Sequence, residues 1–240
     1  MRQGHRLFTT ISLSIISLIG AGPAVFADGS RSPIALKYEK LGQEQSRLFE
    51  SDKAIALFTK GIALCPTDAD LYSNRRHEYE RLYLYDKALA DCEKCIKLQP
   101  ERATFWRDKG YLLDRLKKPH EAIAAYTRAV QLQPSDSGGY THRGDIYRHL
   151  GEYKKAIQDY EESLKHCEQK GIQDELNVLG NLYLKIGDNQ KAIKTFARAI
   201  KLVPDLPQNY YGRAQAYENI GNHPGAYDDR QTAKKLEKEY

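Results

Sequence analysis

The amino-acid sequence predicts an all-α solenoid of six helix–turn–helix repeats, and three observations support this fold class. Punctuating residues recur at intervals of 34 residues, as at Pro66, Pro100 and Pro134. Within each interval, apolar residues are spaced by three or four positions, which is the period of one buried face of an α-helix. A turn signal such as Gly187-Asp188 divides an interval into two helical segments. Repeats of this kind contact only their neighbours, so stacking them builds one continuous core.

The composition fits a folded chain and excludes several classes of protein. The 240 residues are 41% hydrophobic and 29% charged, and 17 glycines with 9 prolines are too few for a collagen-like or low-complexity chain. A mean hydropathy of -0.67 excludes a protein with many membrane spans. Aromatic bulk comes mainly from tyrosine, with 17 Tyr against 6 Phe, which suits thin layers whose rings are buried while the hydroxyls stay hydrated.

Residues 1–27 have the order of a secretory signal peptide. A basic opening with Arg2 and Arg6 precedes an apolar or hydroxylic run over residues 7–21, and cleavage is expected after Ala27. The alternative is an uncleaved anchor, but this run of about 15 residues is shorter than the roughly 20 that a helix needs to cross a bilayer. We therefore expect an exported protein, periplasmic or secreted, whose mature form has no membrane span. A short linker over residues 28–34 is expected to follow.

The charge of the mature chain does not indicate a nucleic-acid-binding protein. Removing residues 1–27 takes away two arginines and no acidic residue, which leaves 35 basic and 32 acidic side chains. A nucleic-acid-binding surface would require clustered basic residues, and none is evident. We expect a solvated surface of mixed charge.

The repeat frame divides the chain after residue 34 into six units of one solenoid domain. These units are residues 35–68, 69–102, 103–136, 137–170, 173–206 and 207–240. One alanine column marks their second helices: Ala54, Ala88, Ala122, Ala156, Ala192 and Ala226. In the fifth unit, the small residues Gly180 and Ala192 are expected to let the two helix backbones approach closely.

The third unit has the fullest set of repeat residues: Trp106, Lys109-Gly110, Leu113, Ala122, Tyr126, Ala129 and Pro134. This pattern resembles the tetratricopeptide repeat family, and the resemblance covers nearly all of the chain after residue 34. The resemblance implies a right-handed superhelix whose first helices line a concave groove that holds segments of other proteins. Gln45 and Arg230 depart from the pattern at the two ends, where capping units present polar surface. Arg76 replaces the usual small residue of the second unit, and nothing in the sequence explains it.

The fourth unit differs from the others at its end. It lacks the punctuating proline and is followed by Gly171-Ile172. We expect its second helix, from about Glu152, to run on through His166-Cys167 and to change the stacking on the fifth unit. The alternative is a slightly longer surface loop.

Basic residues recur at one place that, in the family, lines the groove. The thirteenth place of successive units holds Arg47, Arg81, Arg115, His149 and Lys185, and then Asn219. This stripe would suit an acidic peptide or a chain terminus. The alternative is structural, because the helix dipole favours a cation near the C-terminal end of any helix.

Three asparagines lie at places where the family uses amides to hold a peptide backbone. Asn177 and Asn181 occupy the fifth and ninth places of the fifth unit, and Asn74 lies in the second unit. An amide donates and accepts at once, so two amides one turn apart suit a peptide backbone. The family's clamp for a C-terminal carboxylate is not present around Asn74, because Glu39 and Asp108 occupy two of the flanking places.

Tyr111 and Tyr211 also fall at groove places, beside Arg107 and Gln215. Tyrosine rings supply rigid contact area to a bound peptide. The alternative is that both rings pack between neighbouring first helices.

The sequence favours a protein that is not an enzyme and needs no cofactor. No phosphate-binding loop, nucleophile elbow or zinc-protease motif is present. His142, Asp145 and His149 share one helical face, but no fourth metal ligand is evident, so we predict a polar surface and no metal site.

Cys92 and Cys95 form a C-x-x-C pair inside a predicted second helix, where a small core-packing role is expected. Export makes one disulfide from Cys65 to either of them feasible. Cys167 is two units away and is expected to be unpaired within the chain.

These observations lead to one main functional hypothesis and two others. The main hypothesis is a scaffold, or adaptor, that binds a protein or peptide partner through Asn177, Asn181 and the basic stripe. The second is a structural subunit that joins an envelope assembly through its outer helices or edges. The third, a metal- or redox-dependent activity, would require a bound metal or a reactive Cys92–Cys95 pair.

Overall fold

The structure is a computed structural model that describes residues 32–167 and 172–238. The predicted signal peptide and most of the predicted linker lie outside the described residues. Every regular element in the described ranges is an α-helix, and none of these helices is long and apolar enough to cross a membrane.

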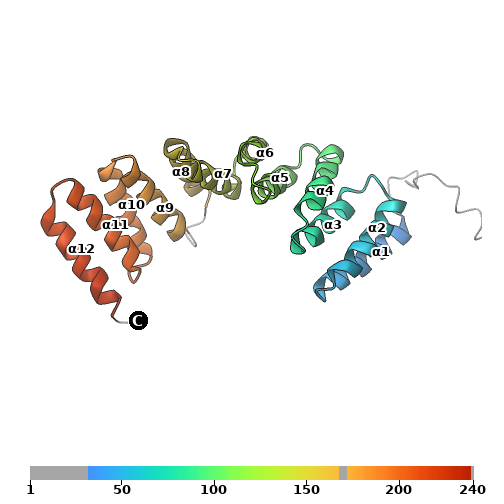
Figure 1. The fold of residues 1–240 in the computed structure, drawn as a ribbon, viewed down its shortest axis with the longest axis horizontal. Coiled ribbons are helices and arrows are strands. Elements are labelled where there is room, and N and C mark those ends of the chain that lie inside the picture. Colours follow the sequence, from blue (N-terminus) through green and yellow to red (C-terminus); the bar gives the residue numbers. More distant parts are fainter. Residues whose placement is uncertain (1–31, 168–171, 239–240) are drawn as a thin grey trace, which may run out of the picture. The chain divides into compact units, whose positions relative to one another are not determined.

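Each predicted repeat corresponds to one pair of helices (Figure 1), although the first helix begins at Pro33, two residues before the predicted start of the first repeat. The first helices are α1 (Pro33–Arg47), α3 (Ala69–Arg81), α5 (Ala103–Arg115), α7 (Ser137–His149), α9 (Gln173–Lys185) and α11 (Pro207–Asn219). The second helices are α2 (Ser51–Leu64), α4 (Tyr85–Leu98), α6 (Pro119–Leu132), α8 (Tyr153–His166), α10 (Asn189–Leu202) and α12 (His223–Leu236). The predicted all-α solenoid of helix–turn–helix repeats is therefore confirmed.

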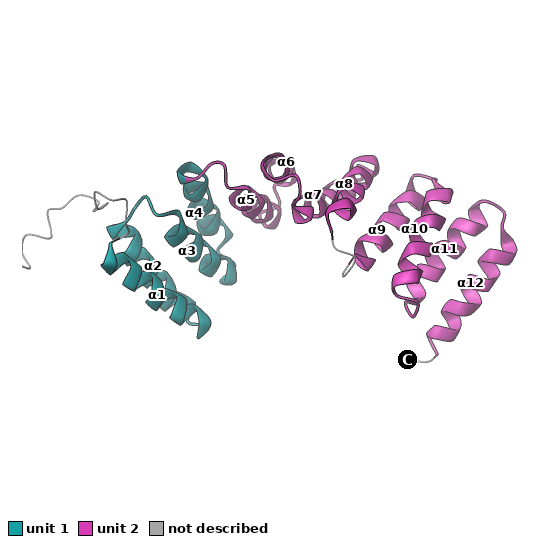
Figure 2. Ribbon diagram, turned by 180° about the vertical axis from the view of Figure 1, so that it is seen from behind, with its two compact units in different colours: residues 1–98 teal, residues 99–240 magenta. Residues whose placement is uncertain are grey.

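The chain divides into two compact units, coloured separately in Figure 2. The first unit ends at Leu98 and contains α1 to α4. The second begins at Gln99 and contains α5 to α12. Within each unit the two helices of a repeat pack against each other, and most second helices also pack against the next first helix.

Close approach of the two helices in a repeat depends on the small residues that the sequence singled out. A Cβ atom added to Gly180 of α9 would lie 2.7 Å from the ring of Phe196 on α10. Ala192 of α10 is fully buried at the same crossing. A larger side chain at either place would push the helices apart, because a packed core has little spare volume.

The turn inside each repeat places one residue in the left-handed region. Glycine fills this place in the last three repeats, as at Gly187 with φ 78°. In the first two repeats the place holds Phe49 with φ 61° and Tyr83 with φ 58°. A bulky side chain is strained there, whereas glycine is not. The first unit therefore keeps two aromatic side chains at a cost to its own stability.

Three partly buried ion pairs join the two helices of the second, fourth and sixth repeats. The Nε and Nη2 groups of each arginine donate to the two carboxylate oxygens of an aspartate sixteen residues later, in the pairs Arg75–Asp91, Arg143–Asp159 and Arg213–Asp229. Such bidentate contacts fix both distance and orientation. These pairs were not predicted from the sequence, although their common spacing of sixteen residues is a signal for them.

The predicted extension of the fourth repeat's second helix is wrong. Helix α8 has 14 residues, the same as α10, and ends at His166. Cys167 ends the helix because its backbone is extended, with φ -83° and ψ 140°.

Arg76, which the sequence left unexplained, forms an ion pair within α3 of the first unit. Its guanidinium contacts Glu80 at 2.9 Å, and only 11% of its side chain is exposed. The long side chain therefore turns along α3 toward an acid one turn later.

The cysteines pack as small apolar residues. Cys92 and Cys95 are fully buried, Cys65 is buried, and all four cysteines are thiols in the structure. The Cys95 thiol also donates to the carbonyl oxygen of Ala69 at 3.3 Å. The predicted core-packing role of the C-x-x-C pair is confirmed.

Candidate functional site

The residues predicted to line the groove are divided between the two units. The first unit contains Arg47, Asn74 and Arg81. The second contains Arg107, Tyr111, Arg115, His149, Asn177, Asn181, Lys185 and Tyr211. All of them lie on first helices, and we call the surface that these helices form within one unit the first-helix face.

In the first unit, Arg81 neutralises a buried carboxylate. Its guanidinium donates to Glu78 Oε2 at 3.1 Å and to the backbone carbonyl of Ser46 at 3.0 Å. The Ser46 hydroxyl donates to the same carboxylate, of which only 1% is exposed. A buried charge of this kind requires a partner. Arg81 is therefore part of the fold of the first unit.

Asn74 and Arg47 lie around a polar cavity of about 470 Å³ between α1 and α3. The Asn74 amide donates to Glu39 Oε1 at 3.2 Å. Arg47 is exposed at the end of α1. This arrangement leaves Arg47 as the predicted cation of the first unit that faces solvent.

In the second unit, three amides form a chain that we call the amide ladder: Asn181, Asn177 and Asn209. The Asn181 amide nitrogen donates to the backbone carbonyl of Asn177 at 2.8 Å and to its Oδ1 at 3.1 Å. Asn177 in turn donates to Oδ1 of Asn209 at 2.9 Å. Asn209 is 0% exposed, whereas Asn181 is exposed. The ladder thus runs from the core to the surface.

The direction of these hydrogen bonds decides what Asn181 can offer to a ligand. Both hydrogen-bonding positions of its nitrogen are used within α9. Its carbonyl oxygen remains to accept a hydrogen bond, for example from a peptide N–H. Asn177 is a positioning residue, because its side chain is bonded on both sides.

Asn181 opens onto a small cavity on the first-helix face. The cavity of about 310 Å³ is also lined by Lys185, Arg148, Val178, Leu182 and Tyr153. Lys185 is exposed, and Arg148 is held by Asp145 at 2.9 Å. The hydrogen bond to Asp145 raises the pKa of the Arg148 guanidinium, which stays charged. The cavity therefore combines the accepting oxygen of Asn181, two cations and an apolar wall, where the fourth and fifth repeats meet.

Arg148 was missed by the sequence reasoning, although a signal was available. It occupies the twelfth place of the fourth repeat, a place that lines the groove in the family. The neighbouring His149, at the thirteenth place, is exposed, and its Nε2 lies 3.3 Å from Nη2 of Arg148.

The remaining predicted residues lie elsewhere in the second unit. Arg107, Tyr111 and Arg115 follow one another at intervals of four along α5, so they share one face of that helix. Arg107 donates to Asp136 at 2.7 Å. Tyr211 donates its hydroxyl to Glu237 at 2.9 Å, and this hydrogen bond raises the pKa of Tyr211. These residues do not line the cavity beside Asn181.

The helix face with His142, Asp145 and His149 has other contacts. His142 packs on the Tyr126 ring, with 5.7 Å between ring centroids. Asp145 accepts hydrogen bonds from both Arg148 and Tyr160. Over the described ranges, no group of three or more His, Cys, Asp or Glu side chains could hold a metal ion.

Comparisons with known proteins agree with this architecture. A protein-family model described as tetratricopeptide repeat matches residues 139–205, and a second model of the same description matches residues 77–137. Together they match just over half of the chain. The small glutamine-rich tetratricopeptide repeat-containing protein 2 of Mycosarcoma maydis is 33% identical over 67 residues, which are 28% of this chain but only 19% of that protein.

Two solved structures share the fold. The C-terminal part of a tetratricopeptide repeat protein from Cytophaga hutchinsonii has a TM-score of 0.71 at 20% identity, with 82% of this chain and 78% of that chain covered. YrrB, described as having an unusual peptide-binding site, has a TM-score of 0.62 at 22% identity, with 75% and 91% covered. At these identities the likeness concerns the fold alone.

Proposed function

Because the chain belongs to the tetratricopeptide repeat family, we propose that it is an adaptor that holds a segment of a partner protein on the first-helix face of its second unit. The family supports the general role of protein interaction, as in YrrB with its peptide-binding site. The observation that carries the specific proposal is the amide ladder, which fixes Asn181 beside Lys185 and Arg148.

The chemistry of the cavity beside Asn181 defines the segment that it would hold. The Asn181 oxygen accepts a backbone N–H of the segment, while Lys185 and Arg148 attract an acidic side chain or a chain terminus. Val178 and Leu182 pack against an apolar side chain. All these groups are on helices or bonded to them, so the receptor loses little conformational entropy on binding.

Replacing Asn181 and Lys185 together by alanine tests this proposal. Both side chains are exposed, so helicity and the melting temperature should stay unchanged. Co-purification of the partner from the native source should fall sharply. The matched control is Gln190→Ala with Lys234→Ala, which removes one exposed amide and one exposed cation elsewhere. Equal capture by both double variants would refute binding at this cavity.

We also propose that the protein acts outside the cytoplasm, on the basis of the order of residues 1–27. N-terminal sequencing of the protein recovered from its own source would test this. A mature chain that begins at Asp28 supports export, whereas a cytosolic chain that begins at Met1 contradicts it.

A structural subunit remains the second candidate, and the turns of the first unit favour it. Phe49 is 83% exposed and Tyr83 is 73% exposed, and Leu48 and Leu84 beside them are exposed as well. Strained backbone that persists at exposed aromatic residues suggests a use for those residues. If the protein is a structural subunit, Phe49→Gly with Tyr83→Gly should disrupt an assembly that size-exclusion chromatography detects in the native extract. The melting temperature should not fall. Unchanged assembly would remove this candidate.

A further inference from the structure

Helix α9 has chemically different surfaces on its two sides. Successive residues of an α-helix are turned by about 100°, so the set Leu176, Leu179 and Tyr183 faces away from Asn177 and Asn181. The amide ladder lies on the second side. The first side packs against α8 and α10.

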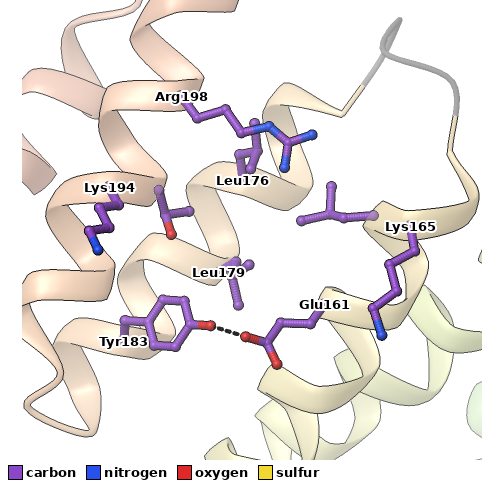
Figure 3. Close-up of a pocket in the computed structure, with 9 residues that line it drawn as sticks. Glu161, Lys165, Leu176, Leu179, Tyr183, Lys194 and Arg198 are labelled. Atoms are coloured by element: carbon purple, nitrogen blue, oxygen red, sulfur yellow. Dashed lines mark hydrogen bonds between the residues drawn. The ribbon is translucent and has the colours of Figure 1, made fainter.

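The first side of α9 forms the base of an open cleft of about 510 Å³, shown in Figure 3. We call it the outer cleft, and its walls come from α8 and α10. Leu164 of α8 joins Leu176 and Leu179 of α9 to give it an apolar base. Its volume lies within the range of about 300–1,000 Å³ that is usual for ligand sites.

The rim of the outer cleft is mainly basic. Lys165 comes from α8, and Lys194 and Arg198 come from α10. Lys165 lies 2.6 Å from Glu162, whereas no ion pair within the described residues involves Lys194 or Arg198. In Figure 3 the Arg198 guanidinium extends over Leu176. Among the described residues, these two exposed cations therefore stand beside an apolar base without an acidic partner.

One acidic residue, Glu161, also lines the outer cleft. It accepts the hydroxyl hydrogen of Tyr183, at the end of the cleft away from Arg198 (Figure 3). Burial, and then this hydrogen bond, raise the pKa of Tyr183, so the hydroxyl stays protonated and keeps donating. The Glu161 carboxylate is therefore engaged by Tyr183, and it comes from α8, whereas Lys194 and Arg198 come from α10.

We infer that the outer cleft is a second recognition site, which binds an acidic protein segment that carries an apolar side chain next to a carboxylate. The apolar side chain lies on Leu164, Leu176 and Leu179, and the carboxylate contacts Lys194 and Arg198. An open cleft suits a chain that passes across it better than a small molecule, which needs enclosure on most sides. This inference is separate from the proposed function, because the residues involved lie on the other side of α9.

The inference is tested with a labelled peptide of alternating leucine and glutamate. Its binding to the purified protein is measured by fluorescence anisotropy at low salt. Lys194→Glu with Arg198→Glu should weaken binding by about tenfold or more, since charge-assisted contacts of a carboxylate are lost. Lys234→Glu with Lys235→Glu on α12 makes the same charge change at exposed positions outside the cleft and should leave binding within about twofold, apart from long-range screening effects.

A second variant tests the cleft by filling it. Thr195 lines the cleft and its hydroxyl bonds only to Lys191 of its own helix, so Thr195→Phe should leave the fold intact. In the Asn181→Ala, Lys185→Ala background, which disables the cavity beside Asn181, it should nevertheless abolish peptide binding. That background alone should keep the binding that Lys194→Glu with Arg198→Glu removes, which separates the outer cleft from the first-helix face.

Three results with the leucine–glutamate peptide would overturn the inference: no binding by the wild type, equal binding by Lys194→Glu with Arg198→Glu, or equal binding by Thr195→Phe. A peptide with serine in place of leucine should bind at least about tenfold more weakly, because it lacks the apolar contact. Equal binding of that peptide would show a general charge effect and would also contradict a cleft site.

Discussion

Arg81 and Lys185 occupy the same thirteenth place of their repeats, yet they have different roles. Arg81 neutralises the buried carboxylate of Glu78, whereas Lys185 is exposed beside Asn181. The cause lies three residues earlier, at the tenth place, where the second repeat has Glu78 and the fifth has Leu182. A shared repeat position therefore places a side chain on the first-helix face, but the local neighbour decides whether it is available to a partner.

The largest expected difference is in the free energy of unfolding of two single variants, one without Arg81 and one without Lys185. Arg81→Ala leaves Glu78 buried without its charge partner, which should lower the free energy of unfolding of the first unit by about 3 kcal/mol. Lys185→Ala removes an exposed side chain and should change stability by less than about 0.5 kcal/mol. Hydrogen exchange of α3 and α9 amides measures the two effects. Equal losses of stability in the two variants would contradict the different roles of Arg81 and Lys185.

A double-mutant cycle on Glu78 and Arg81 sharpens the same comparison. Glu78→Leu gives the second repeat the residue that the fifth repeat has, and Arg81 can then extend into solvent. Arg81→Ala should cost about 2 kcal/mol less in the Glu78→Leu background than in the wild type. Urea unfolding of the four proteins measures this coupling, and a value near zero would show that Arg81 does not act through Glu78.

A smaller effect is expected at the buried end of the amide ladder. Asn209→Ala removes the acceptor of the Asn177 amide and should lower the free energy of unfolding by about 1 kcal/mol. It should also weaken partner capture, because Asn177 then no longer positions Asn181. Asn219→Ala on the same helix breaks two exposed amide contacts, with Asn189 and with Gln215, and serves as the control. Capture that is unchanged in Asn209→Ala would mean that the ladder does not position Asn181.

The smallest effect is an alkaline loss of stability at Tyr160 of α8, whose hydroxyl donates to the Asp145 carboxylate that also accepts from Arg148. Burial, and then the hydrogen bond to Asp145, raise the pKa of Tyr160 above its ordinary value of 10.0. The folded state therefore keeps the proton longer than the unfolded state does. The resulting stability is fully present below pH 10.0 and is lost as the pH rises above it.

Tyr160→Phe removes this group and should reduce the alkaline loss of stability. The measurement is the urea midpoint of the wild type and of Tyr160→Phe on both sides of that pH. An identical alkaline decline in the two proteins would show that Tyr160 does not contribute to it.

Much of the fold was predictable, because the repeat period and the helical spacing are properties of the sequence itself. Each of the six predicted units contains a helix pair, and Gly180 packs against the second helix as expected. The end of α8 was not predictable from the missing proline, since it depends on the backbone of one residue, Cys167.

The candidate site was predictable only in part. The family pattern placed Asn177, Asn181 and Lys185 on one face, and the cavity beside Asn181 includes two of them. The acceptor Asn209 comes from the next repeat, at a place that the pattern does not mark as part of the groove. The ion pair of Arg81 depends on Glu78, a buried acid in its own repeat, and predicting that pair requires knowledge of side-chain packing. Helical position alone gives neither fact.

The central claim is that the first-helix face beside Asn181 contacts the partner segment. Photo-cross-linking in the native source tests it most directly, with a photoreactive residue in place of Val178, which lines that cavity. We predict a partner adduct at Val178 that disappears when Asn181 and Lys185 are both replaced by alanine. An adduct that persists in that double variant, or that forms only from a probe at Tyr83 in the first unit, would contradict the account.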